Sequence, residues 1–398
     1  MDSGVRTIEG SRQFVRDLLF LSSIGVLSYI LAFYVSSYIA HHTSPEAFGD
    51  YQVTMTVLSF LAVLALFGDS STLLQYGSKY RTLKRNITPL LTWIRNRYIF
   101  SVILVSIVLP LYFFLHQHFL DRELAEVVDH HPSNIVLFYI PVAVLSLLLS
   151  AYWTAHNKSV FATTVAKIIV PALFLVFLVY LDFSAIEFTV SHLVVSYLVF
   201  QVVGCLILFA MFFYKKEYTE TGDTPDEVGE WKSTSRINWL ISVMYQLSAS
   251  LGLFFLEWLG SEKEVGVYGA LVVITSIFYI LSGPAVKNLS PHISSLIDTD
   301  NQMLEKKVFL SNKIMFFILV VPFLALMIFS HKVLSHFHID FASYHFLLWL
   351  SATGSFIAAN TGLGVAILSF SSKSKELFWA QLARQVILVA LLFILIPL

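Results

Sequence analysis

The sequence has few charged residues and a single cysteine. Only 13% of its 398 residues are Asp, Glu, Lys or Arg, whereas 57% are hydrophobic and the mean hydropathy is +0.75. A soluble chain of this length would need far more polar groups to cover its exterior. The composition therefore predicts that lipid surrounds most of the chain. Cys205 has no partner for a disulfide within the chain, so it gives no information about the redox compartment.

Sequence motifs of several function classes are also lacking. There is no P-loop for ATP, no HExxH, no defensible Ser/His/Asp order and no zinc-type spacing. The formal net charge of −1 and the lack of a basic tail argue against binding to nucleic acid. We therefore expect a protein that is not an enzyme, holds no metal or other cofactor, and does not bind nucleic acid.

Long apolar runs are what the sequence has in abundance. Each run has about 20 residues, enough to cross a hydrocarbon core of roughly 30 Å, and lipid cannot satisfy open backbone groups, so every span should be helical. The eleven predicted spans are 18–40, 51–74, 97–116, 134–155, 165–182, 190–214, 237–258, 267–289, 310–330, 343–369 and 377–397. No small-residue cleavage site follows the first run, which we therefore interpret as a retained span. The predicted class is an all-α polytopic membrane protein.

The basic residues divide unequally between alternate connections. Only Arg122, Lys263 and Lys332 lie on one side, and the other 22 Lys and Arg residues lie on the opposite side. Acidic residues show no such bias, with 13 on the basic side, 12 on the other and Asp69 inside a span. Lys and Arg mark the cytoplasmic side of membrane proteins. The N-terminus is therefore predicted to be cytoplasmic.

A long polar stretch suggests that the chain has two halves. Residues 215–236 predict a cytoplasmic linker between an N-terminal six-helix lobe, 1–214, and a C-terminal lobe, 237–398. The segment SPEAFGDYQ at Ser44–Gln52 has a counterpart, SEKEVGVYG, at Ser261–Gly269, with serine, glycine and tyrosine in matching places. An even number of spans per half gives parallel repeats. We predict two pseudo-symmetric lobes around a central cavity, an architecture that by analogy favours transport.

Two acidic residues are candidates for cation coupling or gating. Asp69 lies inside predicted span two, where an unpaired charge is costly and commonly marks a pathway for protons or sodium. With the Ser and Thr residues that follow it, Asp69 could instead cap or unwind the inner end of that span. Glu257 lies near the outer end of span seven, beside Trp258. It could serve in gating or simply anchor the helix at the interface.

Basic residues near the inner ends of several spans are candidates for an anion site. If the spans turn them inward, they form a ring that could receive a phosphate or pyrophosphate. The alternative is that these side chains extend to the cytoplasmic headgroups. The set comprises Arg16, Lys79, Arg81, Lys167, Lys287 and Arg384. Lys287 and Arg384 are flanked on both sides by apolar sequence, which favours a site more strongly for these two.

Several loosely matching segments extend over nearly the whole chain. They are the short basic segment before span one, SPEAFGDYQVTMTVLSFLAVLALFGD, AHNKSVFATTVAKIIVPALFLVF, SEKEVGVYGALVVITSIFYIL and the final GVAILSFSSKSKELFWAQLARQVILVALLFILIPL. Together they resemble the polysaccharide flippase family within the superfamily of multidrug, oligosaccharidyl-lipid and polysaccharide exporters.

The resemblance implies both a substrate and a mechanism. The protein would carry an undecaprenyl-pyrophosphate-linked oligosaccharide from the cytoplasmic to the outer leaflet of a bacterial inner membrane by alternating access. Arg16, Lys287 and Arg384 would bind the pyrophosphate, with Arg81 and Lys167 as further candidates, and Asp69 is the nearest match to the buried acid of cation-coupled relatives. Membrane lipids, a polysaccharide polymerase and assembly proteins would be partners. The family has at least twelve spans, whereas eleven are predicted here. Either a twelfth helix follows, which the repeat favours, or the second lobe is one helix short.

Two other functions stay open at this point. A cation-driven multidrug exporter would share the architecture and use Asp69 or Glu257, but would not need the inner arginines. A membrane-embedded glycan polymerase or ligase would need a catalytic base in an outer loop, where Asp121, Glu123 and Asp129 are the nearest acidic residues.

Overall fold

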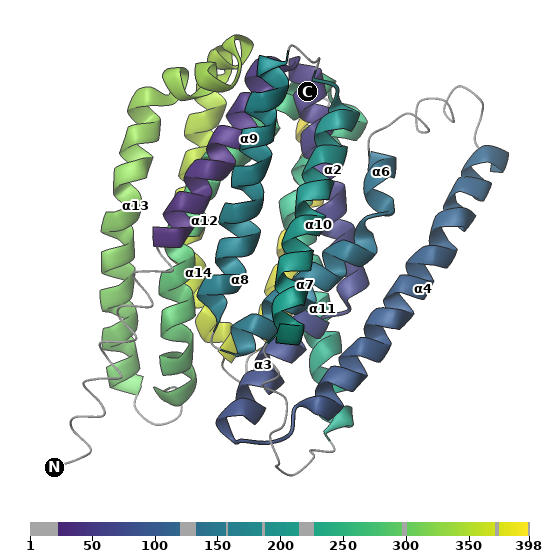
Figure 1. The fold of residues 1–398 in the computed structure, drawn as a ribbon. Helices are drawn as coiled ribbons and strands as arrows, with labels where there is room; N and C mark the ends of the chain where they lie inside the picture. Colours follow the sequence, from purple (N-terminus) through teal and green to yellow (C-terminus); the bar gives the residue numbers. More distant parts are fainter. Residues whose placement is uncertain are drawn as a thin grey trace. The chain divides into compact units, whose positions relative to one another are not determined.

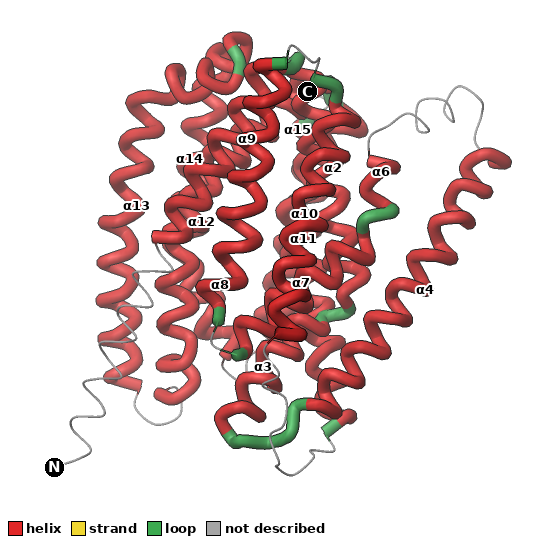
Figure 2. Tube along the Cα trace, viewed as in Figure 1, coloured by secondary structure: helices red, strands yellow, loops and turns green. Residues whose placement is uncertain are grey.

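The computed structural model describes residues 23–119, 133–156, 158–184, 188–214, 227–296, 301–370 and 374–396. Within these ranges the regular elements are all helical, and short connections join them (Figure 2). Each of the eleven predicted spans overlaps a helix. Eight helices in the described residues are long and apolar enough to cross a membrane, and Ile140–Ala155 and Phe378–Ile394 are shorter apolar helices.

The helices follow one another in the order shown in Figure 1. After a first helix, Ser23–His42, come α2 (Pro45–Leu66), α3 (Asp69–Thr82), α4 (Thr88–Phe119), α6 (Ser133–Leu137), α7 (Ile140–Ala155), α8 (Ser159–Thr164), a π-helical turn (Val165–Ile169), α9 (Val170–Phe183), α10 (Val190–Tyr214), α11 (Val228–Leu259), α12 (Glu262–Leu296), α13 (Asn301–Phe337), a 3₁₀ turn (Ile339–Tyr344), α14 (His345–Phe370) and α15 (Ser374–Leu395).

Several helices begin earlier than the apolar pattern predicts. Helix α4 starts at Thr88 instead of residue 97, and α11 starts at Val228 instead of residue 237. Helix α11 thus includes residues 228–236 of the predicted linker 215–236. The early start of α11 has a tertiary cause, because Trp231 is 1% exposed and packs against the rings of Tyr80 and Trp93. Burial of one large side chain stabilises a helical turn that is otherwise polar.

The chain divides into two compact units. The smaller unit comprises residues 1–45 and 267–387, and the larger unit comprises residues 46–266 and 388–398. The residue ranges of the two units differ from those of the predicted lobes, 1–214 and 237–398. The two lobes stay a prediction.

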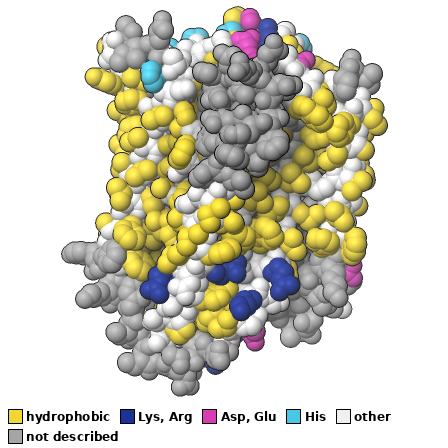
Figure 3. Space-filling view, turned by 90° about the vertical axis from the view of Figure 1, so that its right-hand side faces the viewer, with side chains coloured by type: hydrophobic (Ala, Val, Ile, Leu, Met, Phe, Trp, Pro, Cys, Tyr) yellow, Lys and Arg dark blue, Asp and Glu magenta, His cyan; other side chains and the backbone are white. Residues whose placement is uncertain are grey.

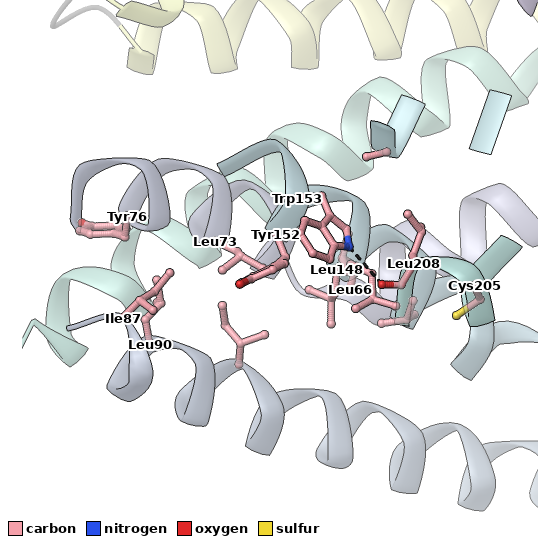
Figure 4. Packing of buried hydrophobic residues seen from close by; sticks show 14 of the residues in the cluster. Leu66, Leu73, Tyr76, Ile87, Leu90, Leu148, Tyr152, Trp153, Cys205 and Leu208 are labelled. Atoms are coloured by element: carbon pink, nitrogen blue, oxygen red, sulfur yellow. Dashed lines mark hydrogen bonds between the residues drawn. The ribbon is translucent and has the colours of Figure 1, made fainter. Parts of the chain in front are cut away.

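The core of the larger unit lies among α3, α4, α7, α10 and α11. Figure 4 shows its apolar side chains, with the indole nitrogen of Trp153 donating a hydrogen bond to the carbonyl oxygen of Leu208 at 3.1 Å. Cys205 is buried in the same cluster, so its role in the fold is packing. The core is thus built from helices that are distant in sequence.

In the smaller unit, the first helix packs against α12 and α13. The hydroxyl of Tyr29 donates to the carbonyl oxygen of Ile274 at 3.0 Å, and the ring of Phe33 stacks on His336 and meets Phe337 edge-on. Between α13 and α14, the indole nitrogen of Trp349 donates to the hydroxyl of Ser330 at 3.0 Å. Aromatic side chains therefore connect segments at opposite ends of the sequence.

The two segments of the predicted internal repeat meet in the larger unit. A Cβ atom at Gly49, in α2, would lie 2.8 Å from the carbonyl oxygen of Glu262 and 3.0 Å from the amide nitrogen of Gly266, in α12. Only glycine permits such a close approach of two backbones. Gly49 and Gly266 are matching positions of the predicted repeat. The parallel repeat itself stays a prediction.

The surface agrees with a lipid environment. On the face that Figure 3 shows, hydrophobic side chains cover a broad area, and most of the visible Lys and Arg side chains lie in the lower half of the view. The exposed side chains of α4 include Ile99, Phe100, Ile103 and Ile107, each about half exposed. An apolar surface of this kind would be unstable in water and is expected where lipid is the solvent.

Candidate functional site

The most polar buried feature of the larger unit is a break between α2 and α3. Phe67 and Gly68 both adopt left-handed backbone conformations, with φ of 49° and 77°, and α3 then begins at Asp69. A Cβ atom at Gly68 would lie 2.2 Å from the carbonyl oxygen of Ser235 in α11. The prediction that Asp69 lies well inside a span is thus wrong. The span ends at Leu66, because a residue with positive φ interrupts the helix and α11 occupies the space beside it.

An ion pair fills this break. Arg97, on α4, donates from Nε to both carboxylate oxygens of Asp69, at 2.8 and 2.9 Å. Its Nη2 donates to the hydroxyl oxygen of Ser235 at 3.2 Å and to the carbonyl oxygen of Phe67 at 3.3 Å. The hydroxyl of Ser235 is 2.6 Å from the Phe67 carbonyl oxygen and 3.0 Å from Asp69 Oδ1. The guanidinium carbon also lies 4.8 Å from the ring centre of Trp93.

This Asp69 cluster (Phe67, Asp69, Arg97 and Ser235) connects the α2–α3 break with α4 and α11. The Asp69 side chain is only 4% exposed and that of Arg97 31%, so the carboxylate is buried and its charge is compensated. The geometry agrees with the interpretation that Asp69 marks an unwound inner end of span two. A role of Asp69 in cation coupling stays a prediction.

A second polar cluster connects α3 with the start of α11. Glu227 accepts hydrogen bonds from the Tyr80 hydroxyl at 2.7 Å, from Lys79 at 3.1 Å and from Arg85 at 3.1 Å. The indole nitrogen of Trp231 donates to the Tyr80 hydroxyl at 2.8 Å. The Tyr80 hydrogen bond, with the two nearby cations, lowers the pKa of Glu227 below its ordinary value, against a smaller opposing effect of burial. Burial and the Glu227 carboxylate raise the pKa of Tyr80.

The Glu227 cluster should make stability depend on pH. Because the pKa of Glu227 is lower in the folded protein than the ordinary value of 4.5, its contribution is fully present above that value. The contribution is lost as the pH falls through the lower folded pKa. We expect thermal unfolding in detergent, followed from pH 7 to pH 3.5, to show a decline below about pH 4.5 that is smaller in Glu227→Gln. The same slope in the variant and in the unchanged protein would contradict this assignment.

Beside these clusters lies an apolar groove with a volume of about 310 Å³. Helices α3, α4, α7 and α10 contribute its walls. The lining side chains are Leu73, Thr88, Leu91, Thr92, Ile94, Arg95, Tyr98, Leu145, Leu148, Leu149, Tyr152, Phe209 and Phe212. Figure 4 shows how Leu73, Leu148 and Tyr152 lie among the buried side chains next to it. Among the described residues that line the groove, Arg95 is the charged one.

The predicted cationic residues lie in different parts of the structure. In the larger unit, Arg81 is half-buried on α3 and Lys167 is exposed on the π-helical turn. In the smaller unit, Arg384 is exposed on α15, and Lys287 lies on α12, where only its backbone is described. Arg16 lies outside the described residues. The pyrophosphate ring therefore stays a prediction.

Glu257, the second predicted acid, is half-buried near the end of α11. The neighbouring Trp258 is 67% exposed, and its ring meets Phe393 of α15 edge-on. An exposed tryptophan beside a carboxylate near a helix end is typical of the membrane interface. A gating or coupling role of Glu257 stays a prediction.

The sequence interpretation missed Arg97, Ser235 and Glu227 as parts of buried or half-buried clusters. The apolar pattern places Arg97 at the cytoplasmic end of a span that it predicts to begin at residue 97. One local signal was present, since Gly68 followed directly by Asp69 and Ser70 is a combination that ends one helix and starts another. Nothing local identifies Arg97 or Ser235 as partners, because each comes from a separate helix.

Comparison with known proteins identifies the family. The model of the family described as polysaccharide biosynthesis protein matches residues 14–297, more than half of the chain. The chain belongs to this family. The predicted resemblance to the polysaccharide flippase family of the exporter superfamily is thus confirmed. A comparison with curated protein sequences finds no match.

Solved structures with the same fold are multidrug transporters. An inward-facing multidrug resistance MATE family transporter of the MOP superfamily is 18% identical, with a TM-score of 0.61 over 89% of this chain and 88% of the other. A MATE protein in the straight conformation has a TM-score of 0.65 at 17% identity, over 92% and 84% of the two chains. The MATE multidrug transporter DinF-BH in complex with R6G has a TM-score of 0.64 at 16% identity, over 94% and 86%.

These comparisons confirm the predicted fold class. The polysaccharide biosynthesis family member is an all-α, multi-pass membrane protein that shares its fold with MATE transporters of the MOP superfamily. At 16–18% identity the structural similarity establishes the fold alone.

Proposed function

We propose that the protein translocates a polyprenyl-pyrophosphate-linked oligosaccharide from the cytoplasmic to the outer leaflet of a bacterial inner membrane, for the synthesis of a cell-surface polysaccharide. The observation that carries the proposal is the match of residues 14–297 to polysaccharide biosynthesis proteins, combined with an exporter fold. A transporter in such a pathway must move a glycan across a membrane. A lipid-linked glycan is a substrate that a helix bundle open to lipid can receive. The N-terminus would be cytoplasmic, and a polymerase and assembly proteins would be partners.

In this proposal the candidate cations receive the pyrophosphate. Arg384 and Lys167 are exposed residues, and Arg16 and Lys287 remain candidates from the sequence. Arginine offers paired donors that match phosphate oxygens. Sodium or protons would drive the cycle through Glu257, or through Asp69 once it is released from Arg97.

Export of a small cationic or aromatic compound is the alternative function. Multidrug export is favoured by the solved structures that share the fold, which are described as multidrug transporters. The Asp69–Arg97 ion pair is an observation against one form of it, because the carboxylate that would bind the cation is already paired. We therefore rank glycolipid translocation first.

Translocation can be measured with the purified protein in liposomes. A fluorescent polyprenyl-pyrophosphate oligosaccharide is added, and label in the outer leaflet is quenched over time. We expect protein-dependent translocation, and a rate about tenfold lower in Arg384→Glu, because a charge-assisted contact to the pyrophosphate becomes a repulsion. Lys332→Glu is the matched control, since Lys332 is an exposed cation of the smaller unit on the side predicted to be outer.

Three results would contradict parts of this proposal. Unchanged translocation with Arg16, Lys287 and Arg384 all replaced by Gln would exclude the cationic site. Loss of polymerised or transferred glycan when Asp121, Glu123 and Asp129 are neutralised together would favour a polymerase or ligase. Cation-driven efflux of a dye without any translocation of glycolipid would establish the multidrug alternative.

A further inference from the structure

The apolar groove of the larger unit has a distinctive distribution of polar groups. Its volume of about 310 Å³ is at the lower end of the range of about 300–1,000 Å³ for ligand pockets. The walls from α7 and α10 are aliphatic and aromatic, whereas the polar lining residues Thr88, Thr92 and Arg95 all come from the first turns of α4. The groove therefore has polar groups on the α4 wall and an aliphatic and aromatic lining from α7 and α10.

The groove is accessible from the lipid-facing surface. Phe209, which lines it, is 39% exposed, and Thr92 and Arg95 are exposed. On α4 the surface next to the groove continues with Ile99 and Phe100, which are 47% and 58% exposed. Both α4 and α10 are membrane-spanning candidates. A ligand of this groove would therefore come from the membrane itself.

Arg95 is available for an anion. Among the described residues its hydrogen bond is to the side chain of the adjacent Asn96, at a long 3.4 Å. Arg97, only two residues further along α4, instead donates hydrogen bonds to Asp69, Phe67 and Ser235. An exposed guanidinium beside an apolar groove matches an amphiphile that has a hydrocarbon chain and a phosphate headgroup.

We propose that this groove binds the phosphate-proximal prenyl units of the polyprenyl-pyrophosphate carrier, with Arg95 contacting the phosphate; the proposal rests on the proposed function above. A prenyl chain is branched and unsaturated, so its units are broad and partly flat. The lining offers four aromatic rings, from Tyr98, Tyr152, Phe209 and Phe212, together with leucines. Broad units fill such a surface with more contacts than a straight acyl chain would make.

Photolabelling tests the proposal without requiring translocation. The full chain in lipid nanodiscs is exposed to farnesyl diphosphate carrying a diazirine on the chain, irradiated and mapped by mass spectrometry. We expect label on residues 88–98, 145–152 and 209–212, displaced by unlabelled polyprenyl phosphate. Thr92→Trp, which fills the groove from an exposed position, and Arg95→Gln should each lower the labelling about tenfold.

Matched controls separate groove binding from general effects. Ile99→Trp adds the same ring at an exposed position of α4 outside the lining, and Lys232→Gln removes an exposed cation outside the groove. Both should leave the labelling unchanged. Label that phosphatidylglycerol displaces equally well, that spreads evenly over the lipid-facing helices, or that persists in Thr92→Trp would overturn the proposal.

The failure of this proposal and that of the proposed function give different results. Normal glycolipid translocation with label outside the groove would reject the prenyl site and leave the function standing. Specific groove labelling without translocation of any glycolipid would keep the site and reject the function.

Discussion

Replacing Gly68 with alanine should destabilise the protein by about 3 kcal/mol or more. Two costs add at this position. A residue with a side chain is strained at a φ of 77°, and the added Cβ would lie 2.2 Å from the carbonyl oxygen of Ser235 and 2.7 Å from the amide nitrogen of Trp239. Both neighbours are backbone atoms of α11, so neither can move without displacing the helix. We expect a lower midpoint of thermal unfolding in detergent and less monodisperse protein after purification.

Gly229→Ala provides the matched control for Gly68→Ala. Gly229 lies in the first turn of α11, and a Cβ there would meet nothing within 4 Å. Alanine is a better helix former than glycine by up to about 1 kcal/mol, so this variant should be unchanged or slightly more stable. Equal stability of the two variants would mean that α11 does not pack against the α2–α3 break as described.

Removing one partner of the Asp69–Arg97 pair should have an effect of similar size. In Arg97→Gln the Asp69 carboxylate stays in a site where its side chain is 4% exposed, with Ser235 as its remaining side-chain donor. Loss of one partner from a buried pair costs about 3–5 kcal/mol, because the other charge is left uncompensated. Asp69→Asn should be less costly, since Arg97 is 31% exposed and reaches solvent more easily.

The double variant Asp69→Asn with Arg97→Gln distinguishes a direct pair from two independent effects. If the two side chains interact as described, the double variant should be more stable than the sum of the single changes indicates, and thermal unfolding of the four proteins measures the difference. Arg95→Gln, on the same helix but exposed, should not change stability. Strict additivity of the two changes would contradict the ion pair.

The same variants bear on the role of Asp69 in transport. If Asp69 serves only to stabilise the helix break, Asp69→Asn should translocate substrate in proportion to the amount of folded protein. If it couples a cation, translocation by the folded fraction should lose its dependence on the sodium or proton gradient. The glycolipid assay, repeated with and without a gradient, separates these two outcomes.

Much of the fold was predictable because its main determinants are local. Runs of about 20 apolar residues specify helices that cross a bilayer, whatever they pack against, and so each predicted span overlaps a helix. Boundaries were less predictable where polar residues continue a helix. Trp231 extends α11 toward its N-terminus by packing on Tyr80 and Trp93, which are distant in sequence.

The sequence by itself determined the membrane class, the helical spans, the family and the bias of Lys and Arg toward one side. These properties depend on transfer of side chains between water and lipid, which each segment undergoes largely alone. Only the tertiary structure decided that Asp69 lies at a helix break, that Arg97 and Ser235 compensate its charge, and that four helices enclose an apolar groove beside Arg95. The physical reason is that hydrogen bonds, ion pairs and grooves form between side chains from separate helices. Their partners are set by helix packing, which no local pattern of residues specifies.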